Sequence, residues 1–184
     1  MLGIYFATKY GYAALAVDSD ELQRLWLPYS NLDRLRQELV DEGYYPFEWN
    51  KETPEFPSWV DHLVELIQRY FRGLLTHPDF SFVPLNKTSW SRFQNLVYKA
   101  LHEVPYGMTM TYRELADKIG SPGAARAVGT CMAKNKFPLI MPCHRIIKSD
   151  GKIGNFTADG SVQLKQAMLS IESSGFATDD IGNI

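Results

Sequence analysis

A cysteine followed directly by a histidine lies inside a stiff apolar run, Pro138-Leu-Ile-Met-Pro-Cys-His-Arg-Ile-Ile147. Pro142 fixes its own φ and favours an extended conformation at the residue before it, so Cys143 sits on a backbone with little freedom. A thiol held in place in this way can serve as a nucleophile. Taken alone, a free cysteine in an apolar run is more often a small buried hydrophobe. The adjacent His144 and Arg145, a helix-turn-helix pattern upstream and a basic surface favour the nucleophile.

The composition is that of a chain with a packed core. Hydrophobic residues make up 45% of its 184 residues and aromatic residues 13%, enough for one compact domain or two small ones. Two cysteines, Cys131 and Cys143, are too few for a disulfide framework or a four-cysteine zinc site, and they suggest a reducing compartment. We expect no metal and no cofactor. The sequence shows no signal peptide and no apolar run that could span a membrane. It predicts a soluble protein, cytoplasmic or, in a eukaryotic host, nuclear.

The net charge of −2 hides an uneven distribution along the chain. Residues 1–84 carry a net −6, residues 85–155 a net +7 and residues 156–184 a net −3. A basic block inside an acidic chain indicates a local contact with a polyanion. On composition alone, an ordinary solvated charged face explains the block equally well.

The first part of the chain, 1–84, is predicted to be an α/β scaffold domain. Alternation over 2–7 and 12–17 predicts a hairpin, and the apolar spacing over 58–73 predicts a helix. A further helix is expected after Asn31, with Leu32, Leu35, Leu39 and Val40 facing inward. The segment 44–57 is expected to be a loop. The boundary is placed within His77–Lys87, a segment that holds two prolines.

The second part, 85–184, is predicted to be mostly helical. A helix over 90–103 is expected to bury Phe93, Leu96, Val97, Ala100 and Leu101. Thr111-Tyr-Arg-Glu114 fits a capping box that opens a short helix, which Gly120 ends. Ser121 and Pro122 fit an N-cap and the first position of a second helix. Helix, short glycine-containing turn and helix form a helix-turn-helix, although two-helix corners that bind no DNA are also common.

The second helix of this pair presents two different faces. Its buried stripe is expected to hold Ala124, Ala127, Val128 and Cys131, with Arg126 on the opposite side. Small residues around one outward arginine allow a close approach to a partner, although an ordinary exposed arginine fits as well. Beyond the cysteine, 139–147 and 152–153 are expected to pair as strands. A last helix over 161–173 carries Glu172 at the edge of its apolar stripe.

Pro142-Cys-His-Arg145, preceded by Arg126-Ala-Val-Gly129 and Asn135, resembles the O6-alkylguanine-DNA alkyltransferases, also called methylated-DNA–protein-cysteine methyltransferases. The resemblance runs from about Tyr70 to Glu172. It implies an α/β (α+β) fold: an N-terminal RNase H-like α/β domain, then a mostly helical domain with a helix-turn-helix and a short active-site strand. It also implies a monomer that binds double-stranded DNA containing O6-alkylguanine through the minor groove.

The resemblance implies a single-turnover reaction in which the damaged base is rotated out of the duplex and Cys143 accepts its alkyl group. His144 would activate the thiol through a water, and Glu172 would orient His144. Tyr112 would help to rotate the nucleotide and donate a hydrogen bond to the leaving guanine, Arg126 would fill the vacated stack, and Asn135 would brace the active-site turn. Further contacts to DNA are implied for Arg113, Ser121 and Ser149, and to the base for Met132, Pro138, Ile146, Phe156 and Thr157.

Some positions depart from the family pattern. Lys136 replaces a frequent proline, Phe156 a frequent tyrosine, and Ala158-Asp159 a frequent glycine pair. These changes bear on the size of the alkyl group accepted. Two other functions remain open: a non-catalytic alkyl-lesion sensor or helix-turn-helix regulator, and a cysteine hydrolase that uses Cys143, His144 and Glu172. The hydrolase would leave Arg126 and the basic block without a role.

Overall fold

The computed structural model describes residues 1–49, 55–154, 156 and 162–179, with side chains described up to residue 174. The chain divides into two compact units, Met1–Asn86 and Lys87–Ile184. Among the described residues, no helix has the length and apolar character needed to cross a bilayer. The fold is mixed α/β, as predicted.

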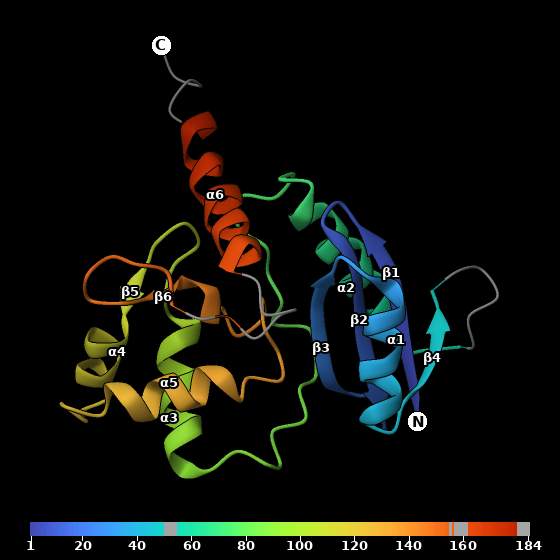
Figure 1. Cartoon of the computed structure of the whole chain (residues 1–184), viewed down its shortest axis with the longest axis horizontal. Helices are drawn as coiled ribbons and strands as arrows, with labels where there is room; N and C mark the ends of the chain where they lie inside the picture. The colour runs from blue at the N-terminus through green and yellow to red at the C-terminus, as the bar shows by residue number, and fades with distance from the viewer. Residues whose placement is uncertain (50–54, 155, 157–161, 180–184) are drawn as a thin grey trace. The chain divides into compact units, whose positions relative to one another are not determined.

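The first unit is a four-stranded sheet with the strand order β3-β2-β1-β4 (Figure 1). The hairpin β1 (Leu2–Thr8) and β2 (Gly11–Asp18) is confirmed, and β3 (Glu21–Tyr29) continues it antiparallel. The edge strand β4 (Tyr45–Glu48) pairs parallel to β1. The prediction of a loop over 44–57 was therefore wrong for the residues of β4. The strand was missed because β1, with which it pairs, is distant in the sequence.

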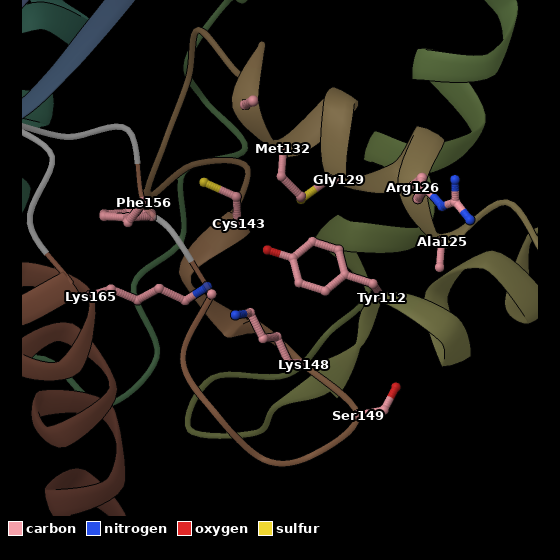
Figure 2. Close-up of a pocket in the computed structure, with 12 residues that line it drawn as sticks. Tyr112, Ala125, Arg126, Gly129, Met132, Cys143, Lys148, Ser149, Phe156 and Lys165 are labelled. Atoms are coloured by element: carbon pink, nitrogen blue, oxygen red, sulfur yellow. The ribbon is translucent and has the colours of Figure 1, made fainter.

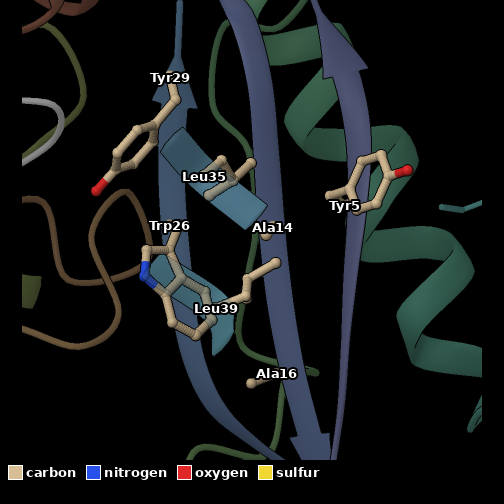
Figure 3. Close-up of a cluster of buried hydrophobic side chains, with 7 residues drawn as sticks. All are labelled: Tyr5, Ala14, Ala16, Trp26, Tyr29, Leu35 and Leu39. Carbon is tan, nitrogen blue, oxygen red and sulfur yellow. The ribbon is translucent and has the colours of Figure 1, made fainter. Parts of the chain in front are cut away.

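Two helices complete this unit, α1 (Leu32–Asp41) and α2 (Ser58–Phe71). The Asn31 side chain accepts a hydrogen bond from the Arg34 amide and so begins α1 where the sequence predicted. Leu35 and Leu39 of α1 pack with Ala14 and Ala16 of β2, whose small side chains allow the helix to approach the sheet (Figure 3). Val40 is 52% exposed, so its predicted inward position was wrong. This unit contains none of the predicted site residues.

The second unit contains four helices and two very short strands among its described residues (Figure 1). The helices are α3 (Arg92–His102), α4 (Tyr112–Lys118), α5 (Ala125–Ala133) and α6 (Val162–Asp179). Strands β5 (Met110–Thr111) and β6 (Ile146–Ile147) pair in parallel. The expected pairing of 139–147 with 152–153 was wrong, because Cys143–Arg145 forms one turn of 3₁₀ helix, η1, before β6 begins. The predicted inward positions of Leu96 and Ala127 were also wrong, since both are exposed.

The helix-turn-helix consists of α4 and α5. The Thr111 side chain accepts from the Glu114 amide at 3.1 Å, and Glu114 Oε2 accepts from the Thr111 amide at 2.7 Å, which confirms the predicted capping box. Helix α4 therefore begins at Tyr112. The second helix begins at Ala125, not after Ser121, because Gly120 and Gly123 adopt positive φ values of 68° and 85° in the intervening turn.

Candidate active site

Cys143 lies in the wall of a cavity of about 480 Å³ inside the second unit. Figure 2 shows the pocket between α4, α5, the loop after β6 and the start of α6. The cavity is lined by Tyr112, Ala125, Arg126, Gly129, Met132, Ala133, Cys143, Lys148, Ser149, Gly154, Phe156 and Lys165. Its volume is in the range of pockets that hold small organic ligands. Three cations and no carboxylate occur among these residues, so the cavity favours a partner that carries negative charge.

A braced loop leads into Cys143. Leu139 has a φ of 73°, an unusual value for a residue with a branched side chain. The side chain of Asn135 holds this loop at two points: Oδ1 accepts from the Phe137 amide at 3.0 Å, and Nδ2 donates to the Met141 carbonyl at 2.8 Å. Cys143 follows this loop and is 5% exposed, and the two hydrogen bonds from Asn135 hold the backbone that leads to it.

Burial raises the pKa of the Cys143 thiol, since a thiolate is poorly solvated in the wall of the cavity. A hydrogen bond from Asn135 and the positive charge of Lys165 act in the opposite direction and lower that pKa. The thiol is thus mainly protonated at neutral pH, and a base is needed to generate the nucleophile. Asn135 and Lys165 reduce the energy needed for this step.

A base is held directly behind the cysteine. His144 and Glu172 are both fully buried, and His144 Nε2 lies 2.6 Å from Glu172 Oε1. Burial lowers the pKa of His144, although Glu172 raises it, so the imidazole is neutral near pH 7 and can take up a proton. The carboxylate holds Nε2 and thereby fixes the orientation of the ring, which leaves Nδ1 as the atom that accepts the proton. This arrangement follows the logic of a nucleophile, an oriented base and an orienting carboxylate.

A hydrogen-bond donor enters the cavity from the opposite side. Tyr112 projects from the first turn of α4, and its hydroxyl end points toward the part of the cavity that holds Cys143 and Lys165 (Figure 2). Burial and the nearby Cys143 raise the pKa of the Tyr112 hydroxyl, so the group stays protonated. Gly154 leaves room for this hydroxyl, because a Cβ atom at that position would lie 3.0 Å from the Tyr112 oxygen.

The structure brings together six of the predicted site residues in the cavity wall: Tyr112, Arg126, Met132, Cys143, Ser149 and Phe156. His144, Glu172 and Asn135 support the wall from behind, and Ile146 contributes its carbonyl to a hydrogen bond with Lys165. Pro138, Arg113 and Ser121 do not line the cavity; Arg113 is exposed on α4 and Ser121 lies in the turn between α4 and α5. Thr157 lies outside the described residues.

Sequence reasoning missed two charged residues of this site. Lys165 is 1% exposed, and its Nζ donates to the Ile146 carbonyl at 2.5 Å. Arg145 is 9% exposed and is bound to Glu172 through two nitrogens. The signal for Lys165 was its spacing from Met168 and Glu172, which places the three residues on one face of α6. The signal for Arg145 was only its position beside His144.

The buried cysteine and its oriented histidine are typical of proteins with a thiol nucleophile, and the adjacent helix-turn-helix is typical of DNA-binding proteins. The site therefore defines a DNA-binding protein that reacts through a cysteine. Residues 92–174 match the family model described as 6-O-methylguanine DNA methyltransferase, DNA binding domain. The methylated-DNA–protein-cysteine methyltransferase of Mycobacterium tuberculosis H37Rv is 38% identical over 143 residues, which cover 77% of this chain and 81% of the relative. The constitutive Bacillus subtilis protein of that name is 32% identical over 165 residues, covering 90% and 91%.

The solved structures agree with the sequence relatives. The crystal structure of Mycobacterium tuberculosis OGT in complex with DNA superposes with a TM-score of 0.72 at 31% identity, covering 95% of this chain and 94% of that one. The chain belongs to the methylated-DNA–protein-cysteine methyltransferase family.

Proposed function

We propose that this protein repairs duplex DNA by moving an alkyl group from O6 of guanine to the sulfur of Cys143. The observation that carries the proposal is the cavity itself. It places a buried thiol, a protonated tyrosine and an outward arginine around a space of about 480 Å³. A base inside a duplex has to leave the stack to enter such a space.

Cys143 first loses its proton to His144 through a water. The sulfur then attacks the alkyl carbon, forming the S–C bond as the C–O6 bond breaks, and the guanine keeps the electron pair. The Tyr112 hydroxyl donates a hydrogen bond to the departing guanine, which lowers the energy of its negative charge. The product is a thioether at Cys143. Because a thioether is chemically stable, each molecule reacts once.

The residues of the helix-turn-helix are assigned to the DNA. Arg126 is exposed on α5 between small residues, and its side chain can occupy the space that the rotated base leaves in the stack. Arg113, Ser121 and Ser149 are polar groups at or near the surface of the same unit and are assigned to the phosphate backbone. Met132 and Phe156, which line the cavity, are assigned to the base together with Thr157 and the Ile146 carbonyl; Pro138 does not line the cavity and receives no such role.

We assign the two parts of the chain different tasks: 85–184 binds DNA and performs the transfer, and 1–84 is a scaffold. The protein acts as a monomer in the compartment that holds the genome, which is the cytoplasm, or the nucleus in a eukaryotic host. The alternative of a lesion sensor that performs no chemistry is not favoured, because Cys143 is present and its base is in place.

The test is a mass measurement after incubation with duplex DNA that contains O6-methylguanine. One methyl group on Cys143 is expected, with no turnover beyond one equivalent. Cys131→Ser is the matched control, because Cys131 is the other buried free thiol and should not affect transfer. Cys143→Ser should abolish transfer and retain binding to the lesion. A protein that binds the lesion but gains no mass would be a sensor, and a methyl group on Cys131 would contradict the assignment.

A further inference from the structure

Arg145 is bound to the carboxylate that orients the proposed base. Its Nε donates to Glu172 Oε2 at 2.8 Å, and its second terminal nitrogen donates to Glu172 Oε1 at 3.1 Å. The remaining terminal nitrogen donates to the Val104 carbonyl at 2.7 Å, and the guanidinium lies 5.5 Å from the centre of the Tyr106 ring. A bidentate arginine–carboxylate pair of this kind is fixed in geometry as well as in charge.

Glu172 is therefore shared between the guanidinium of Arg145 and the neutral imidazole of His144. Its Oε1 faces both His144 and Arg145, and its Oε2 accepts from Arg145 and from the Gly107 amide at 2.9 Å. A buried carboxylate bound only to a histidine would favour the imidazolium form of that histidine. A protonated His144 could not accept the proton of Cys143. The charge on Glu172 thus has to be balanced by another group if the histidine is to work as a base.

We propose that Arg145 is a positioning residue that balances the charge of Glu172, so that the carboxylate orients His144 without protonating it. The inference rests on the proposed function, in which His144 is the base. With Arg145 positive, Glu172 negative and His144 neutral, this buried group has no net charge, the state that costs least in a medium of low polarity.

The other charged and titratable groups around His144 fit this assignment. Lys165 of α6 adds positive charge that lowers the pKa of His144, as Arg145 does, although burial lowers it more. Cys143 of η1 is mainly protonated, since burial raises its pKa. Tyr106 is neutral, because burial raises its pKa to about 12. Glu172 is thus the group that favours protonation of His144, and Arg145 is the cation that contacts it directly.

The test compares Arg145→Met, which removes the charge, with Arg145→Lys, which keeps it. Nuclear magnetic resonance of the imidazole nitrogens follows the titration of His144 in each variant, with His62, His77 and His102 as internal references. In Arg145→Met the His144 midpoint should rise by about 1 pH unit or more, the usual effect of exposing a titrating group to an unbalanced opposite charge. In Arg145→Lys the midpoint should stay near that of the unaltered protein.

The same variants are then assayed for the rate of methyl transfer as a function of pH. Transfer by Arg145→Met should fall as the pH is lowered through the new, higher His144 midpoint and recover as the pH rises above it, so its pH profile should be shifted upward relative to that of the unaltered protein. If the role of Arg145 were merely structural, transfer by Arg145→Met would be lowered equally at every pH, and the His144 titration midpoint of the folded variant would be unchanged. That result would overturn the proposal.

Should Arg145→Met fail to fold, the double variant Arg145→Met, Glu172→Gln removes both charges of the pair. Its His144 should again be neutral at pH 7, and a His144 midpoint above neutrality in that variant would contradict the inference. The titration needs no DNA, so its outcome is independent of the proposed repair reaction. A protein that transfers no methyl group but shows the expected shift would refute the proposed function alone.

Discussion

The Nζ atom of Lys165 lies 2.5 Å from the carbonyl oxygen of Ile146, so α6 is joined to β6 by a buried ammonium group. Among the described residues no carboxylate forms an ion pair with this lysine. Burial lowers its pKa, and the nearby Cys143 acts in the opposite direction. The cation is therefore placed where negative charge develops on the sulfur.

Replacing Lys165 by methionine should raise the pKa of Cys143, because the positive charge that lowers it is removed. We expect alkylation of Cys143 by iodoacetamide at pH 7 to slow by about tenfold, the effect of one pKa unit. Lys165→Arg retains the charge and serves as the control. Lys148→Met removes a different cation of the cavity wall and should have a smaller effect; equal losses for Lys148→Met and Lys165→Met would exclude a specific role.

Gly154→Ala should change the range of alkyl groups that the site accepts. The new Cβ would lie 3.0 Å from the Tyr112 oxygen and would push the hydroxyl by a few tenths of an ångström into the cavity. Transfer of a benzyl group should fall more than transfer of a methyl group. Gly129→Ala is the matched control, since its Cβ would lie at an ordinary 3.9 Å from the same ring. If the rates of benzyl transfer and of methyl transfer fell by the same factor, the steric explanation would be contradicted.

Arg126→Ala separates rotation of the base from the chemistry. Because Arg126 is assigned to the vacated stack, its loss should slow repair of duplex DNA by about 10-fold or more, a few kcal/mol of unstacking being the energy involved. Reaction with free O6-benzylguanine, which needs no rotation, should change little. Lys134→Ala removes an exposed cation at the end of α5 and controls for general attraction to DNA. An equal fall in the reaction rate with duplex DNA and with free O6-benzylguanine would show that Arg126 does not act in rotating the base.

Acid should destabilise the second unit through Glu172. Burial raises the pKa of this carboxyl, but its hydrogen bonds and charge interactions with His144 and Arg145 outweigh burial and hold the pKa at about 2. A pKa below the ordinary value stabilises the folded state above about pH 4.5, and this stabilisation is lost as the pH falls toward 2. Thermal unfolding of Glu172→Gln should therefore begin at a lower temperature at pH 7, and it should depend less on pH between about pH 5 and about pH 3. Parallel curves for the two proteins would contradict the assignment.

The sequence predicted those parts of the fold that local signals determine. The Asn31 cap, the capping box at Thr111 and the apolar spacing of α2 depend on residues a few positions apart, and the structure confirms each. Strand β3 was missed because charged residues and a proline interrupt its pattern, and β4 because it pairs with β1 across more than thirty residues. The turn of 3₁₀ helix at Cys143 was taken for strand because both conformations suit a short apolar run.

The candidate site was predictable where it depended on residue type and not where it depended on three-dimensional neighbours. Cys143 and His144 were indicated by the chemistry of their side chains, and Tyr112 by the resemblance to the alkyltransferase family. The structure places Tyr112 and Cys143 in the wall of one cavity, with the buried His144 next to Cys143 in the chain. No role in the site was predicted for Arg145 or Lys165, because long basic side chains are normally solvent-exposed. Only the folded chain shows that a carboxylate and a carbonyl oxygen hold them inside.

Glu172 joins three separate stretches of the chain, since it accepts from Gly107 before β5 and from His144 and Arg145 of η1 while belonging to α6. The fold would need this junction even in a relative that had abandoned chemistry. The presence of the histidine, the arginine and the glutamate in a homologue would therefore indicate the same fold at this junction, and it would not by itself indicate alkyl transfer. Whether such a homologue is spent by its substrate or merely marks a damaged site should be judged from the one position that carries sulfur.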